Sequence, residues 1–240
     1  MFRIRENEIA DALTTSDIWK IMLKEVPPIA AEYFVGGADE LTTLKANVLA
    51  FKQVLIAPRG AIKNKYIDTT SKIFGEKLSL PFFISPVGSL RTLWPKADAV
   101  ASKVAGDFGT AMSLSTLSQT PMEDVCEASS GPKWFQLYLC GGRETAKIGI
   151  LRAKQAGFSA LILTIDTAVS GNRIEHARMK PMDATSSIFS GPRKIGRLYH
   201  KAKLAPQIST RLGWLLRHWN DGGILPLSLI HISEPTRLQD

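Results

Sequence analysis

The sequence from Trp134 to Ile165 reads WFQLYLCGGRETAKIGILRAKQAGFSALILTI, and it decides the predicted fold. Its two ends, residues 134–139 and 160–165, are short apolar runs rich in aromatic and branched aliphatic side chains, which is typical of strands buried on both faces. Between them, residues 143–156 repeat small and apolar side chains at helical spacing, and Gly157 supplies a stop signal. A strand, a helix and a second strand with no hairpin turn between them predict two parallel strands joined by a crossover helix.

The same pattern extends toward the N-terminus. Residues 81–86 and 110–115 are further apolar runs bounded by Gly, Pro or Ser, and we predict both as strands. Residues 96–105 and 121–128 have the spacing of helices. The sequence therefore predicts an α/β protein in which four parallel strands alternate with helices.

Parallel strands form either an open nucleotide-binding sheet or a closed barrel. An open sheet would carry G-x-G-x-x-G or G-x-x-x-x-G-K-[ST] after its first strand, and the sequence contains neither motif. The predicted strands instead have polar carboxyl ends, where a (β/α)8 TIM barrel places its chemistry. Such a barrel needs about 250 residues. We therefore predict a TIM barrel truncated after about four β/α units and preceded by an N-terminal helical segment.

Composition excludes several classes of protein. The 240 residues are 45% hydrophobic and 22% charged, which is unlike a disordered tail, a collagen-like fibre or a coiled coil. No apolar run reaches the roughly 18 residues needed to cross a bilayer, and the acidic N-terminus lacks the order of a signal peptide. These features predict a cytoplasmic protein. Neither cysteine lies at metal-ligand spacing from another cysteine or a histidine, so no metal site is predicted.

The net charge of +8 is concentrated in one segment. Ten basic and three acidic residues lie between Arg173 and Asp221, so this stretch holds seven of the eight net charges. Trp214 and Trp219 lie in the same stretch, and an anionic membrane surface or a nucleic acid could bind such a segment. The simpler interpretation is a solvated insertion with few buried contacts. We expect no nucleic-acid partner, and a peripheral contact with the inner face of the membrane is the alternative to a purely cytoplasmic location.

Six short motifs resemble, in order and spacing, the FMN-dependent L-2-hydroxy acid oxidases and dehydrogenases. That family includes glycolate oxidase, lactate oxidase, lactate monooxygenase and mandelate dehydrogenase. The resemblance runs from about Ile18 to Arg173, and it implies FMN as cofactor and a small 2-hydroxy acid as substrate. The motifs are YFVGGA (33–38), TLKAN (43–47), PVG (86–88), LST (114–116), WFQLY (134–138) and LTIDT (163–167).

The resemblance also implies roles for individual residues. The nitrogen and oxygen edge of the flavin ring would be held by residues at predicted strand ends: Pro86, Val87, Gly88, Ser115, Gln136 and Thr164. Tyr33, Tyr138 and Arg173 match the substrate contacts, because phenol hydroxyls and a planar guanidinium suit a carboxylate. Without the resemblance, Tyr33 would be interpreted as a helix-end packing residue and Arg173 as a surface charge.

Two departures from the family pattern stand out. Where the family commonly has His-Pro-x-Gly-Glu, this chain has Trp94-Pro95-Lys96-Ala97-Asp98. The family's general base is a histidine in the second half of the barrel, within Ser-x-His-Gly. None of the four histidines here has that context, so none is assigned a catalytic role.

These observations predict four regions. Residues 1–75 form the helical segment and barrel lead-in, residues 76–173 the first half of an FMN-binding barrel, and residues 174–226 a basic insertion. Residues 227–240 are expected to be non-native, because LSLIHISEPTR (227–237) resembles the translation of a synthetic transposase adapter. The chain is thus expected to be an inactive piece of an enzyme whose full-length form is a homo-oligomer. The alternative to an enzyme fragment is a half-barrel that acts as a binding or assembly module and has no catalytic activity.

Overall fold

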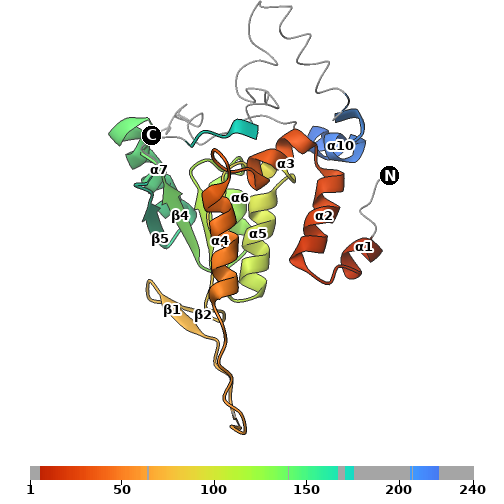
Figure 1. Cartoon of the computed structure of the whole chain (residues 1–240). Coiled ribbons are helices and arrows are strands. Elements are labelled where there is room, and N and C mark those ends of the chain that lie inside the picture. Colours follow the sequence, from red (N-terminus) through yellow and green to blue (C-terminus); the bar gives the residue numbers. More distant parts are fainter. Residues whose placement is uncertain are drawn as a thin grey trace, which may run out of the picture. The chain divides into compact units, whose positions relative to one another are not determined.

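The computed structural model describes residues 6–63, 65–139, 141–166, 171–175, 206 and 208–221 (Figure 1). The predicted tail at 227–240 and most of the basic insertion lie outside these residues, as does Thr167. The chain divides into two compact units, which are described separately. The first is Met1–Ala61 with Val169–Ile224, and the second is Ile62–Ala168 with Leu225–Asp240.

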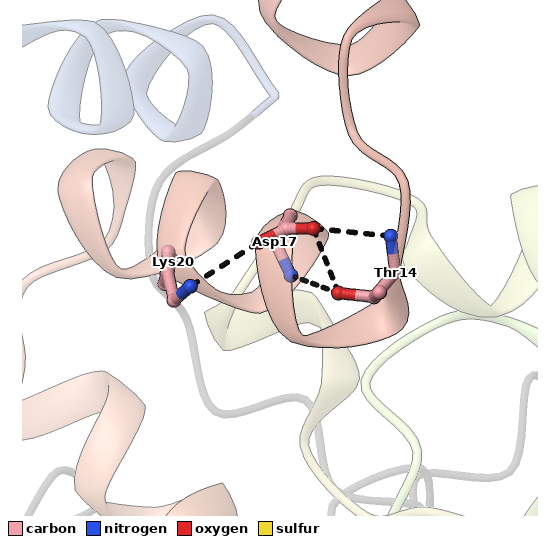
Figure 2. A network of polar contacts seen from close by, with 3 residues as sticks. All are labelled: Thr14, Asp17 and Lys20. Atoms are coloured by element: carbon pink, nitrogen blue, oxygen red, sulfur yellow. Dashed lines mark hydrogen bonds and ion pairs between the residues drawn. The ribbon is translucent and has the colours of Figure 1, made fainter.

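The described part of the first unit is helical. Helix α2 (Thr15–Glu25) begins with a capping box (Figure 2). The Thr14 hydroxyl accepts the Asp17 N–H at 3.2 Å, and the Asp17 carboxylate accepts the Thr14 N–H at 3.1 Å. Hydrogen bonds from Thr14 and then from Lys20 hold the pKa of Asp17 below its ordinary value. The helices are α1 (Glu6–Ala10), α2 (Thr15–Glu25), α3 (Pro28–Val35), α4 (Thr42–Gln53) and α10 (Leu212–Asn220).

Helix α10 corrects the expectation of few buried contacts in the basic insertion. Trp214 and His218 are one helical turn apart, so they lie on the same face, and both are buried, with ring centroids 4.3 Å apart. An ion pair of 2.9 Å between Arg217 and Glu25 joins α10 to α2, which lies beside it in Figure 1. Amphipathic spacing therefore lets this part of the basic segment pack, while Trp219 stays 76% exposed on the other side.

The second unit contains the predicted alternation of strands and helices. Its sheet has the order β3-β4-β5, and both neighbouring pairs are parallel. The strands are β3 (Met112–Ser115), β4 (Lys133–Leu137) and β5 (Ala160–Leu163). The helices are α5 (Ala97–Asp107), α6 (Met122–Glu127) and α7 (Gly142–Ala156), close to the predicted ranges. A short 3-10 helix, η1 (Leu90–Thr92), precedes α5, and Gly157 ends α7 in the left-handed conformation, as its sequence predicts.

The first predicted strand is wrong as a full strand. Residues 81–86 form only an isolated parallel bridge between Ile84 and Met112. The Ile84 N–H donates to Ala111 O at 3.0 Å, and the Ser113 N–H donates to Ile84 O at 2.9 Å. Ladder bonds to one neighbour come from every second residue, so the next donor after Ile84 would be residue 86, a proline without an amide hydrogen. Toward the amino end, Gly109 O accepts the Ser79 N–H at 2.7 Å instead of a bond from residue 82.

The last strand also differs from its prediction, because β5 is not buried on both faces. Leu161 and Leu163 are 44% and 50% exposed, whereas every residue of β3 and β4 is buried. Within the described residues, β5 pairs with β4 alone and is therefore an edge strand. Half-burial follows from this edge position.

The sheet has two different faces. On the outer face, Leu114 and Phe135 pack with helix residues such as Val125 and Ala153 in one apolar cluster. On the inner face, Trp134 packs with Leu78 and Ala111 in a second cluster. Leu78 comes from an antiparallel hairpin of β1 (Ser71–Ile73) and β2 (Glu76–Leu78), which the sequence did not predict. The hairpin thus covers the inner face near the start of the strands.

Side chains alternate along a strand, so residues two positions apart share a face. Trp134 and Gln136 therefore point to the same inner side, as do Ile162 and Thr164. The inner face is apolar at the amino ends of the strands and polar at their carboxyl ends. This gradient places the candidate site.

Candidate functional site

Gln136 is the centre of a hydrogen-bonded group that joins all three strands of the sheet. Its Oε1 accepts the Ser115 hydroxyl at 3.1 Å and the Thr116 N–H at 3.2 Å. Its Nε2 donates to Thr164 Oγ1 at 2.6 Å. Ser115 and Gln136 are 3% exposed, and Thr164 is half-buried. The structure therefore brings together three residues that the sequence assigned to the flavin ring.

The loop after β3 is tied to β4 by a second set of bonds. The Thr116 hydroxyl donates to Gln136 O at 2.6 Å and accepts the Tyr138 N–H at 3.0 Å. The Leu117 N–H donates to Ser115 Oγ at 3.1 Å. These bonds fix the carboxyl end of β4, including the backbone of Tyr138, relative to β3.

The turn formed by Pro86, Val87 and Gly88 lies next to this loop. The Ser89 N–H donates to Leu117 O at 3.0 Å, which connects the turn to the loop after β3. Among the described residues, the N–H groups of Val87 and Gly88 make no backbone hydrogen bond. Both are therefore donors that a ligand could use.

A buried carboxyl group supports the same loop from the side of α5. Asp98 is 1% exposed and lies in the first turn of that helix. Its Oδ2 accepts the Ser118 hydroxyl at 3.0 Å and the Thr120 hydroxyl at 2.9 Å. Burial raises the pKa of Asp98, and the hydrogen bonds from Thr120 and Ser118 oppose that rise. Sequence reasoning named Asp98 only as a departure from the family motif.

Two of the three expected substrate residues meet in the first unit. Arg173 donates from Nη1 to Tyr33 O at 2.5 Å, and its guanidinium lies 5.0 Å from the centre of the Tyr33 ring. Tyr138, the third, is half-buried in the second unit. Tyr33 and Tyr138 belong to separate units, so their expected shared contact with one substrate stays a prediction.

The donors left in the strand-end group suit the edge of a flavin ring. One hydrogen of the Gln136 amide and the hydrogen of the Thr164 hydroxyl have no acceptor among the described residues. Together with the two turn amides they offer fixed donors to ring oxygen and nitrogen atoms.

No group of three potential metal ligands occurs in the described ranges. In that same part of the chain, no helix is long and apolar enough to pass through a bilayer.

Comparison with known proteins gives consistent matches. A family model described as FMN-dependent dehydrogenase matches residues 22–211. The L-lactate dehydrogenase of Alcaligenes faecalis is 32% identical over 227 residues, which are 95% of this chain and 57% of that protein. Glycolate oxidase 1 of Zea mays is 30% identical over 208 residues, which are 83% of this chain and 56% of that protein.

Solved structures give the same result. The chain is similar to a soluble mutant of the membrane-associated (S)-mandelate dehydrogenase from Pseudomonas putida, with a TM-score of 0.65 and 32% identity. That match covers 69% of this chain and 47% of the other. The chain therefore spans about half the length of the curated relatives and solved structures that it matches.

Proposed function

Because the chain belongs to the FMN-dependent dehydrogenase family, we propose that it is part of an oxidoreductase that converts a small L-2-hydroxy acid to the 2-oxo acid. The observation that carries this proposal is the hydrogen-bonded group of Ser115, Gln136 and Thr164 at the carboxyl ends of adjacent parallel strands. A parallel α/β sheet with a polar carboxyl end is also what the TIM barrel of this family requires. Lactate, glycolate and mandelate are the substrate types that the relatives' names support.

The strand-end residues would hold the edge of the flavin ring. When bound, FMN supplies the acceptor for the hydride equivalent that leaves the substrate's α-carbon. The Gln136 amide, the Thr164 hydroxyl and the amides of Val87 and Gly88 would donate hydrogen bonds to that edge. Fixed donors of this kind stabilise negative charge without reorganising during the reaction.

The substrate carboxylate would be held by Arg173 with Tyr33 and Tyr138. A guanidinium carries five N–H donors, so the bond from Arg173 to Tyr33 O leaves donors for a carboxylate. Two parallel bonds from such a planar group orient a carboxylate. Packing of the guanidinium against the Tyr33 ring supports this assignment, because it restricts the orientation of Arg173.

We further propose that this chain is inactive by itself. It has the first units of the barrel, and the family's general base and phosphate contacts belong to the second half. A missing general base typically costs about 10²- to 10⁴-fold in rate. Loss of the phosphate contacts removes the most strongly charged interaction of FMN with the protein.

The test compares this chain with a protein completed from the full-length gene, each mixed with FMN and then gel-filtered. The completed protein should be yellow and should bleach without oxygen on adding L-lactate, glycolate or (S)-mandelate, whereas this chain should elute colourless. Bleaching of this chain by any of the three acids would show that the proposed inactivity is wrong. A completed protein that is yellow but bleaches with none of them would contradict the proposed substrate class. A colourless completed protein that forms a defined assembly would favour the alternative of a binding or assembly module.

A peripheral membrane contact is a second proposal, and the exposed side of α10 supports it. Leu216 and Trp219 are 57% and 76% exposed within a segment of basic sequence, a combination suited to an anionic interface. The completed protein should co-sediment with anionic vesicles in a salt-sensitive manner, and Trp219→Ala should weaken binding. Trp94→Ala, in the second unit and 39% exposed, is the matched control. Equal binding by wild type and Trp219→Ala would remove α10 from the contact.

A further inference from the structure

The loop that joins β3 to α6 is held at both ends, and only one end belongs to the ring-edge group. At its start, Ser115 and Thr116 bond to Gln136. At its end, Ser118 and Thr120 both donate to the buried Oδ2 of Asp98. We infer that Asp98 is a positioning residue for the ring-edge site, acting on it through this loop. The inference rests on the proposed flavin function of that site.

The direction of the hydrogen bonds shows how Asp98 controls the loop. The Ser118 oxygen accepts the Thr120 N–H at 3.1 Å, so its single hydrogen is the donor toward Asp98. An alternative acceptor, Thr120 O, is 3.4 Å away, and the contact with Asp98 is shorter. An ionised carboxylate accepts hydrogen bonds and donates none, so it fixes both hydroxyls as donors.

The loop transmits this constraint to the site over a few bonds. The Ser118 N–H donates to Ser115 O at 3.0 Å, and the Ser115 side chain contacts Gln136. Leu117 O accepts the Ser89 N–H, which follows the turn at Pro86. Asp98 therefore supports both the Gln136 group and the backbone donors of the turn, although it lies outside both.

Burial makes Asp98 a costly residue if its role is only to fill space. Its Oδ1 is buried and has no hydrogen-bond partner among the described residues. Taking a carboxylate out of water without full compensation opposes folding, and burial accordingly raises the pKa of Asp98. Two hydrogen bonds to one loop are what this carboxyl group provides.

The first readout is amide hydrogen exchange, measured on this chain by NMR. The Leu117 and Tyr138 amides report on the loop, and the Ser79 amide, bonded to Gly109 O, reports on the remainder of the second unit. In Asp98→Ala, exchange at Leu117 and Tyr138 should rise about tenfold or more relative to Ser79, because two hydroxyls lose their acceptor. Asp98→Asn should stay within about threefold of wild type, because its amide oxygen can accept both hydroxyls.

Asp124→Ala is the matched control, because Asp124 also lies in the first turn of a helix but is exposed. It should leave all three amides unchanged. If Asp98→Ala does not fold, Thr120→Val removes one donor from the other side and should raise exchange at Leu117 and Tyr138 by about threefold or more. Wild-type exchange at these amides in the folded alanine variant, or in Thr120→Val, would overturn the inference. So would an asparagine variant that behaves like alanine.

The second readout is the effect of FMN on the NMR signals of Ser115, Gln136 and Thr164. FMN added in excess to wild-type chain should shift these signals, and Asp98→Ala should need about tenfold more FMN for the same shift. Asp98→Asn and Asp124→Ala should resemble wild type. Absence of any shift in wild type would count against the flavin function, while the exchange data would still decide the role of Asp98. Equal FMN response in wild type and Asp98→Ala would overturn the positioning role alone.

Discussion

Trp134→Ala is expected to lower the free energy of unfolding of the second unit by about 3–5 kcal/mol, the usual range for removing a large buried aromatic side chain. Trp134 is fully buried on the inner face of β4. Its ring meets Phe74 and Phe83 edge to face, with centroids 5.1 and 4.7 Å away. Its Nε1–H donates to Glu76 Oε2 at 3.0 Å. The alanine variant would therefore leave a cavity under the hairpin and a carboxylate without its partner.

Urea unfolding measures this loss, and two further variants separate its parts. Trp134→Phe keeps an aromatic ring but removes the bond to Glu76, so it should cost markedly less than alanine, about 1–3 kcal/mol. Trp19→Ala, at a position 37% exposed in the first unit, should leave the second unit's transition in place. A loss below about 1 kcal/mol in Trp134→Ala would mean that the hairpin does not seal the inner face.

The sheet and its helices follow from sequence because their signals are local. Residues 134–139 and 160–165 are apolar runs of strand length, and Gly157 marks the end of α7. The first predicted strand failed at its carboxyl end for an equally local reason, since Pro86 has no amide hydrogen for the ladder. That correction was available from the sequence itself.

The hairpin was missed because its signal is weak. Its strands have three residues each and are partly polar, and its two-residue loop is Phe74-Gly75. Both loop residues have positive φ, 51° and 85°, as a type I′ turn requires. Asn or Asp usually occupies the first position, so phenylalanine there gave no turn signal. Burial of Trp134 and Leu78 against each other stabilises the hairpin, and this contact is not local.

The candidate site shows the same division. Ser115, Gln136 and Thr164 could be assigned from motifs at strand ends, and parallel strands bring those ends together. Asp98 could not be assigned in this way, because it lies in the first turn of α5 and not at a strand end, and no motif connects it with Ser118 and Thr120. Only the packing of α5 beside the loop after β3 makes them neighbours.

Gln136→Leu is expected to weaken the response to FMN by about 30- to 100-fold, because the variant loses the hydrogen bonds of both amide atoms at nearly constant volume. The loss has two causes. The variant removes a donor to the ring, and it leaves the Ser115 hydroxyl and the Thr116 N–H without their acceptor. Gln136→Glu separates them, because it keeps the acceptor for both groups but has no N–H for Thr164 Oγ1 or the ring.

FMN fluorescence in the completed protein and NMR shifts in this chain both measure the effect. Gln136→Glu should keep slow exchange at the Leu117 amide but respond to FMN as poorly as Gln136→Leu does. Its carboxylate would face the same ring edge and has no N–H to donate to it. Gln155→Leu, at an exposed position of α7, makes the same substitution away from the site and should match wild type. Should Gln136→Leu retain wild-type affinity, the Gln136 group would be a structural tie between strands, and the turn at Pro86 would be left as the proposed contact to the ring. Because one amide joins Ser115, Thr116 and Thr164, losing it disturbs three strands together, which is why this single residue should have the largest effect on cofactor binding.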